Sequence, residues 1–246
     1  MNLRRVRRAV ALGCTLTIMF LRYWATRLRG PLMLEQRAEW MQFSGRSALA
    51  SLGVHYRVEG DIPERGIVVA NHLSYLDIAI FSAAMKCFFV SKAEIGKWPY
   101  FGKAALAGGT MFVDRSSIAS AERVAAEIGE RLALPIPILF FPEGTSTDGS
   151  SVLRFRSRLF EPAIQAGAPV TAAAIRYILS DGAEERDLCW FGDEAFLPHL
   201  WKALGTPDLT AEIRFGDPHI YGDRRIAADQ TREEVVAMRA SDLVLR

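Results

Sequence analysis

The chain has 246 residues, half of them apolar, and a net charge of only +2 at pH 7. This length fits one large domain, or one domain with an appendage, and the apolar content excludes a largely disordered chain. The three cysteines, at positions 14, 87 and 189, are far apart and form no Cys-x-x-Cys pair. They fit a reducing compartment and argue against a disulfide framework or a zinc cluster.

The N-terminal segment carries the basic charge. Residues 1–34 contain seven arginines and no acid, and taking these seven from +2 leaves −5 on the remainder. Such a basic end indicates an anionic surface, membrane lipid or nucleic acid, as its partner. Thirteen uncharged residues lie between Arg8 and Arg22. As a helix they cover roughly 20 Å, against about 30 Å for a bilayer core.

We therefore expect a membrane anchor that either lies in the interface or, with Arg22 snorkelling, spans the bilayer. A signal peptide is the competing interpretation, but no small-x-small cleavage site follows. Pro31 ends this first helix, and residues 34–53 form a second one that stops at Gly53. The second helix either completes a hairpin against the bilayer or packs on the domain. We expect a helical anchor over 1–53 and one domain over 54–246.

From residue 54 the pattern alternates between short apolar strands and helices. The clearest helix covers 117–134, with apolar residues three and four apart and Ser116 or Ser117 as its cap. A last amphipathic helix covers 230–246. The fold class is therefore α/β, with a mixed, largely buried sheet covered by helices. The expected strands cover 54–60, 66–70, 87–92, 109–114, 136–141, 169–177 and 211–217.

Polar residues follow three of these strands at the point where each strand ends. The strand GIVVA runs into NHLSYLD (71–77), TMFV runs into Asp114 and Arg115, and ILFF runs into PEGTSTDG (142–149). Sites in α/β proteins gather at the carboxyl ends of strands. The convergence of three polar clusters at three such ends predicts a functional site there.

His72 and Asp77 are the pair that suggests catalysis. Five positions on one helix would point them about 140° apart, so only a loop-to-helix transition brings them together. Asp77 would then accept the N–H of one ring nitrogen and leave the other as a base. The competing interpretation is a helix start capped by Asn71 or Ser74, with an incidental histidine. No second His or Cys lies close in sequence, so a metal site is not expected.

Taken in order, the motifs resemble those of the glycerolipid acyltransferase family typified by bacterial 1-acylglycerol-3-phosphate acyltransferases. Its Asn-His-x-Ser-x-x-Asp block is matched over 71–77, and its Gly-x-x-Phe-x-x-Arg block by Gly109, Phe112 and Arg115. Its Phe-Pro-Glu-Gly-Thr block is matched over 141–145, and its Pro-Val strand by 169–170. The resemblance covers roughly 54–220, and four blocks in the correct order make it specific.

The resemblance implies a membrane-bound enzyme that transfers an acyl group from acyl-CoA or acyl-carrier protein to the hydroxyl of a lysolipid. It implies His72 as general base and Asp77 as its orienting partner, without metal or cofactor. It also implies an inner-membrane location on the cytoplasmic face and lipid partners, not nucleic acid. The oligomeric state is left open. The implied substrate-binding residues are Asn71, Ser74, Gly109, Phe112, Arg115, Glu143, Gly144 and Thr145.

One position departs from the family pattern. Members that form phosphatidic acid usually carry Arg directly after Phe-Pro-Glu-Gly-Thr, and this chain has Ser146. Losing that charged donor weakens the case for a phosphate-bearing acceptor. Other basic residues would supply a replacement: Lys92, Lys97, Arg154, Arg156 or Arg158. Lysophosphatidic acid is the first expectation and lyso-ornithine lipid the alternative. A non-enzymatic lipid-binding protein is the competing class, and a metal-dependent hydrolase a more distant one.

Overall fold

The computed structural model describes residues 3–114 and 116–241 and contains a seven-stranded sheet in the order β1-β7-β6-β2-β5-β3-β4. Neighbouring strands are parallel except β6 and β7, which are antiparallel. The predicted mixed α/β sheet is confirmed, and every expected strand forms. The strands are β1 Val54–Glu59, β2 Ile67–Ala70, β3 Phe88–Lys92, β4 Met111–Val113, β5 Ile138–Phe140, β6 Val170–Leu179 and β7 Leu209–Phe215.

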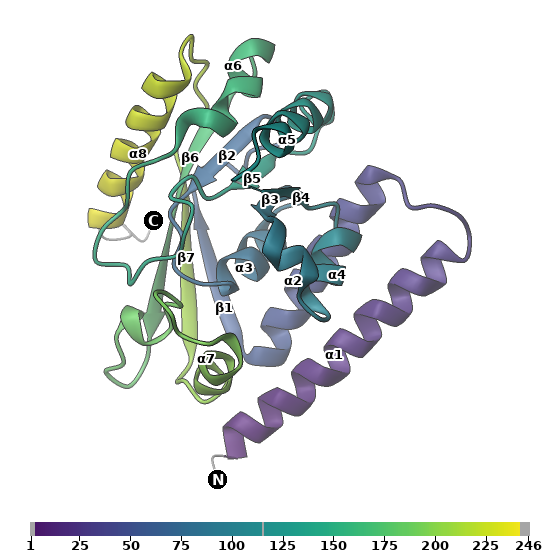
Figure 1. The fold of residues 1–246 in the computed structure, drawn as a ribbon. Helices are drawn as coiled ribbons and strands as arrows, with labels where there is room; N and C mark the ends of the chain where they lie inside the picture. The colour runs from purple at the N-terminus through teal and green to yellow at the C-terminus, as the bar shows by residue number, and fades with distance from the viewer. Residues whose placement is uncertain (1–2, 115, 242–246) are drawn as a thin grey trace.

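Helices cover both faces of this sheet (Figure 1). All four residues of β2 are buried, and they alternate between two cores: Val68 and Ala70 face one, Ile67 and Val69 the other. Because β2 has a core on each side, it is apolar throughout. The main helices are α1 Leu3–Arg27, α2 Leu34–Leu52, α3 Leu76–Ala84, α5 Ile118–Arg131 and α8 Arg224–Ala240. The shorter ones are η1 Ala93–Lys97, α4 Phe101–Ala107, η2 Ser157–Phe160, α6 Glu161–Ala166, η3 Glu185–Asp187 and α7 Phe196–Ala203.

Two helix boundaries show how side-chain capping decides where a helix starts. Ser117, not Ser116, caps α5, since its side chain accepts the N–H of Ser120. The last helix begins six residues before the predicted start at 230, because Asp223 accepts two backbone N–H groups of its first turn. The final predicted residues, 242–246, lie outside the described residues.

The N-terminal helices run antiparallel, with α1 on the outer side of α2 (Figure 1). Helix α2 packs on α3 so closely that a Cβ at Gly45 would meet the backbone oxygen of Ala79 at 2.7 Å. It is thus part of the domain body as well as the partner of α1. Helix α1 is long and apolar enough to cross a membrane, and only 6% of its apolar window is buried. Its exposed apolar side chains include Val10, Ile18, Leu21 and Trp24.

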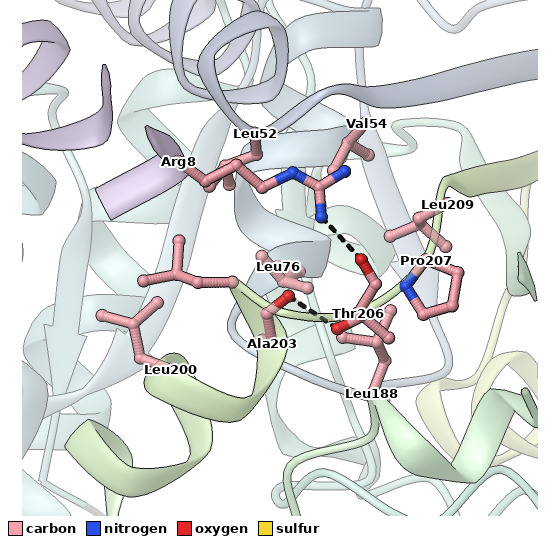
Figure 2. Close-up of a pocket in the computed structure, with 11 residues that line it drawn as sticks. Arg8, Leu52, Val54, Leu76, Leu188, Leu200, Ala203, Thr206, Pro207 and Leu209 are labelled. Atoms are coloured by element: carbon pink, nitrogen blue, oxygen red, sulfur yellow. Dashed lines mark hydrogen bonds between the residues drawn. The ribbon is translucent and has the colours of Figure 1, made fainter. Parts of the chain in front are cut away.

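Arg8 joins the start of α1 to the domain. Its guanidinium donates to the carbonyl of Thr206 at 2.7 Å and contacts Asp208 at 3.4 Å. Figure 2 shows this side chain over a small apolar pocket lined by leucines of α2, α3 and α7. Burial lowers the pKa of Arg8, with a further contribution from Arg4. One of the N-terminal arginines therefore has a structural role as well as contributing to the basic charge.

Candidate active site

Asn71 ends β2 and turns the chain out of the sheet. Its side-chain amide donates to the carbonyl of Ile175 at 3.1 Å, and its Oδ1 accepts the N–H of the same residue at 2.8 Å. The amide thus extends the pairing between β2 and β6 by one position while the main chain leaves the sheet. Asn71 is only 1% exposed. The structure gives Asn71 this loop-holding role and shows that it does not cap α3, whereas its contact with substrate stays a prediction.

His72 and Asp77 meet across the loop-to-helix transition that the spacing required. The Nδ1 of His72 lies 2.7 Å from Oδ2 of Asp77, which also accepts the N–H groups of Leu73 at 2.7 Å and Ser74 at 3.1 Å. Asp77, in the first turn of α3, is fully buried. The capping expectation is therefore wrong: Asp77 binds back to the loop, and neither Asn71 nor Ser74 caps α3 with its side chain.

The imidazole of His72 is held on one face and open at one edge. Its ring stacks on Phe141, with centroids 4.0 Å apart and planes 11° apart. Its side chain is 19% exposed, and among the described residues no group hydrogen-bonds to Nε2. With Nδ1 bound to a carboxylate, Nε2 is the nitrogen that can exchange a proton with a ligand.

Glu143 holds the histidine loop from the neighbouring strand. One carboxylate oxygen accepts the N–H of His72 at 2.8 Å, and the other accepts the N–H of Leu153 at 2.7 Å. Burial raises the pKa of Glu143, although these two backbone hydrogen bonds and His72 oppose the shift. Glu143 is only 3% exposed, and its two backbone hydrogen bonds brace the loop of His72; its contact with substrate stays a prediction.

The remaining residues of the third block shape the loop between β5 and α6. Gly144 adopts a positive φ of 83°, where a side chain would be strained, and Thr145 is exposed. The hydroxyl of Ser146 donates to the carbonyl of Trp190, and the N–H of Trp190 donates to the carbonyl of Leu73 at 2.8 Å. Ser146 therefore ties this loop, through Trp190, to the loop of His72.

The described residues of the second block, Gly109 and Phe112, lie before and within β4. Gly109 precedes β4, where its carbonyl is bound by Arg131 and its Cα packs on Phe88, at the edge opposite His72. Phe112 lies within β4 and packs on Gly96. Gly109 thus lies at the edge opposite His72, and its contact with substrate stays a prediction. Arg115 lies outside the described residues.

A pocket of about 150 Å³ lies beside the third block, which contributes Phe141 and Pro142 to its lining. Phe141, which stacks on His72, lines it together with Arg156 and Arg158. Neither guanidinium has a hydrogen bond or ion pair among the described residues, and both side chains are exposed. Lys92 ends β3 on the same edge of the sheet. The pocket thus combines apolar walls with two unneutralised cations.

Two side chains at the site were missed by sequence reasoning. Tyr177, on β6, donates its hydroxyl to Oδ1 of Asp77 and is itself buried. Arg239, on α8, donates to the carbonyl of Gly149 at 2.7 Å and thereby holds the end of the polar segment 142–149. No local pattern signals either, because both contacts join segments about 90–100 positions apart. Over the described residues, no three His, Cys, Asp or Glu side chains are grouped as metal ligands would be.

Comparison with known proteins adds an independent line of evidence. A family model described as Acyltransferase matches residues 54–176. A 1-acyl-sn-glycerol-3-phosphate acyltransferase of Neisseria gonorrhoeae is 33% identical over 204 residues, with 80% of each chain covered. A lyso-ornithine lipid O-acyltransferase of Rhodobacter capsulatus is 36% identical over 179 residues, covering 70% of this chain and 64% of the relative.

The fold is similar to a solved structure as well. The 1-acyl-sn-glycerophosphate (LPA) acyltransferase PlsC from Thermotoga maritima superposes with a TM-score of 0.67, at 18% identity and over 98% of this chain and 97% of the other. At that identity the match concerns the fold. Together, the family model over half of the chain and the two relatives above 30% identity show that this chain belongs to the acyltransferase family, among enzymes of the 1-acylglycerol-3-phosphate and lyso-ornithine lipid type.

Proposed function

We propose that the protein is a lysolipid O-acyltransferase in which His72 is the general base and Asp77 its orienting partner. The observation that carries the proposal is the His72–Asp77 pair itself: a buried carboxylate at 2.7 Å from Nδ1, with Nε2 open at the carboxyl edge of the sheet. This arrangement fixes one tautomer and leaves a neutral nitrogen ready to accept a proton.

The reaction would proceed by direct attack. Nε2 of His72 takes the proton of the acceptor hydroxyl as the oxygen attacks the carbonyl carbon of the acyl thioester. The tetrahedral intermediate collapses, the C–S bond breaks, and the thiolate leaves with the proton that His72 returns. The products are an ester and a free thiol. The negative charge of Asp77 stabilises the imidazolium while it exists.

For the acceptor, we propose lysophosphatidic acid first, with phosphatidic acid as product. Arg156 and Arg158 line the pocket beside Phe141 and supply the cations that a phosphate requires, in place of the arginine that Ser146 replaces. Lyso-ornithine lipid is the second candidate, because position 146 is uncharged and its hydroxyl is already used by the carbonyl of Trp190. Acyl-CoA and acyl-carrier protein are the two donor candidates.

For the location, we propose the cytoplasmic face of the inner membrane, with α1 lying on or in the bilayer. Lysolipid and product both reside in the bilayer, so the site needs to reach its surface. The exposed apolar side chains of α1 support such an interfacial position, as do Arg22, Arg27 and Arg29 near and just after its C-terminal end.

The experiment that tests the function offers lysophosphatidic acid and lyso-ornithine lipid in parallel to one enzyme preparation, each with acyl-CoA and with acyl-carrier protein. Transfer to either acceptor supports the reaction class, and the faster acceptor identifies the substrate. Lipid binding without transfer to any acceptor would instead favour a non-enzymatic lipid-binding protein.

A matched pair of variants tests the head-group pocket. Replacing both Arg156 and Arg158 by Gln should raise KM for lysophosphatidic acid about tenfold or more, since charge-assisted contacts to phosphate are lost. Arg154→Gln, an exposed arginine of the same segment outside the pocket, is the control. Equal KM values for all three proteins would contradict the assignment of this pocket to the phosphate.

A further inference from the structure

Tyr177 lies directly behind the proposed catalytic pair. It belongs to β6, is only 4% exposed, and donates its hydroxyl to Oδ1 of Asp77. Oδ2 of that carboxylate is occupied by the ring of His72 and by two backbone N–H groups. Among the described residues, the Tyr177 hydroxyl is the one hydrogen-bond donor to Oδ1 of Asp77. The side chain thus controls the half of the carboxylate that His72 does not touch.

The phenol is suited to donate at every pH at which the enzyme would work. Burial raises the pKa of Tyr177 well above its ordinary value, and the neighbouring charge of Asp77 raises it further. The hydroxyl therefore remains protonated and neutral beside the carboxylate. A neutral donor stabilises the ionised form of Asp77 without adding a second charge to the site.

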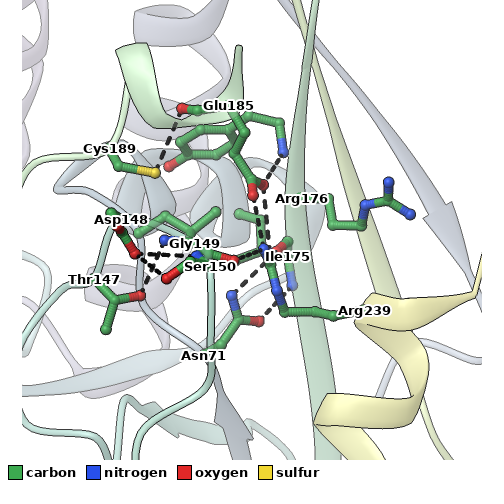
Figure 3. Close-up of polar contacts among 12 residues, drawn as sticks. Asn71, Thr147, Asp148, Gly149, Ser150, Ile175, Arg176, Glu185, Cys189 and Arg239 are labelled. Carbon is green, nitrogen blue, oxygen red and sulfur yellow. Dashed lines mark hydrogen bonds and ion pairs between the residues drawn. The ribbon is translucent and has the colours of Figure 1, made fainter.

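A network that leads to the C-terminal helix holds the backbone of Tyr177, and Figure 3 shows its members Glu185, Arg239 and Gly149. The N–H of Tyr177 donates to Glu185 at 2.8 Å, and Glu185 pairs with Arg239 of α8 at 2.7 Å. Arg239 also binds the carbonyl of Gly149 at 2.7 Å. A Cβ at Gly149 would lie 2.5 Å from Glu185, so this loop packs directly on the network.

We propose that Tyr177 is a positioning residue for the His72–Asp77 pair, which it orients and whose basicity it limits through its hydrogen bond to Oδ1. The inference rests on the function proposed above. It extends the catalytic pair to three connected side chains: His72 in the loop before α3, Asp77 in α3, and Tyr177 in β6.

The sign of the effect follows from the charge that the hydroxyl stabilises. Without this donor, Asp77 becomes a stronger acceptor, it stabilises the imidazolium more, and the pKa of His72 rises. Since the free base is the active form, the acid limb of kcat/KM moves to higher pH. The other ionisable groups that face His72, Asp77 or Tyr177 are unchanged in Tyr177→Phe. They are Glu143, Asp148, Glu185, Cys189 and Arg239.

Two measurements on full-length protein test the inference, with Tyr177→Phe as the variant. The pKa of His72 is read from the ¹⁵N signals of labelled histidine, a readout that needs no substrate. We expect an upward shift of about half a unit to one unit in the variant. Tyr56→Phe, which removes a hydroxyl bonded to the carbonyl of Ala83 at the opposite end of α3 from Asp77, should leave this pKa unchanged.

The pH profile of acyl transfer is the second measurement. The acid limb should move by the same amount, and kcat on the plateau should fall about tenfold as the orientation of Asp77 loosens. If Tyr177→Phe does not fold, site-specific 3-fluorotyrosine keeps the ring and makes the hydroxyl a stronger donor. The pKa of His72 should then move downward, opposite to the effect of Phe.

The outcomes separate the inference from the function on which it rests. An unchanged His72 pKa and acid limb, with only a lower melting temperature, would show that Tyr177 has a merely structural role and would overturn the inference. If wild-type protein transfers no acyl group, yet Tyr177→Phe shifts the pKa of His72 as expected, the proposed function is refuted while the inference stands.

Discussion

Asp77→Asn is the variant whose effect follows most directly from the geometry of the site. The asparagine oxygen can replace Oδ2 and keep the N–H groups of Leu73 and Ser74, so the loop should retain its shape. The tautomer of His72 is kept as well, since the oxygen still accepts from Nδ1. What disappears is the negative charge 2.7 Å from that nitrogen, and the amide NH2 in place of Oδ1 meets the Tyr177 hydroxyl, which can turn to accept from it.

Coulomb's law gives the size of the loss. The imidazolium charge is spread over both ring nitrogens, so its mean separation from the carboxylate is about 4 Å, and at an effective dielectric constant of about 20 the attraction is about 4 kcal/mol. At about 1.4 kcal/mol for each factor of ten, kcat should fall about 10³-fold. The fall should be in kcat and not in KM, because the charge acts when the imidazolium forms.

The assay is the initial rate of acyl transfer at saturating donor and acceptor, with a thermal unfolding curve for each protein. Asp229→Asn removes an equal charge from an exposed position of α8 and should leave kcat unchanged. If Asp77→Asn retains activity within tenfold of wild type, the electrostatic role of Asp77 is refuted.

Three further predictions concern stability and membrane contact. Gly45→Ala should lower the melting temperature by about 5–10 °C, since overpacking costs about 1–3 kcal/mol. Gly129 of α5 has open space around it, so the control Gly129→Ala should be neutral or stabilising. Equal melting temperatures for the two variants would contradict the close packing of α2 on α3. Because burial raises the pKa of Glu143, its contribution to stability is present below about pH 4.5 and is lost as the pH rises through the raised value. Urea unfolding should therefore show a larger deficit for Glu143→Gln at pH 4 than at pH 7, and a deficit that grows with pH would refute the assignment. Acidic residues in place of Leu21 and Trp24 on the exposed side of α1 should release the protein from anionic liposomes in a sedimentation assay, and undiminished binding would contradict the interfacial role of α1.

The fold was largely predictable because its strands carry strong local signals. β2 and β5 are short apolar runs bounded by turn residues, and each ends in a polar motif that marks the edge of the sheet. Their spatial order was not predictable. The placement of β6 between β2 and β7 depends on pairings between segments far apart in the chain.

In the candidate site, too, local contacts could be predicted from the sequence and contacts between distant segments could not. His72 and Asp77 lie five positions apart, so their meeting could be argued from helix geometry. Glu143 was expected to bind substrate because of the family resemblance, and no local pattern predicted that its carboxylate would accept two backbone N–H groups. Tyr177 carried no signal, since its hydroxyl meets Asp77 only after β6 has taken its place in the sheet. Sequence motifs thus identify the pair that we propose as catalytic, and tertiary pairing supplies the residues that support it.

The central claim is that His72 is the base for acyl transfer, and His72→Ala tests it most directly. Rates should be measured with both acceptors and both donors, together with the melting temperature of the variant. The account predicts a fall in kcat of about 10²–10⁴-fold with the fold intact, the range expected for loss of a general base. A folded His72→Ala protein that turns over at close to the wild-type rate would contradict it.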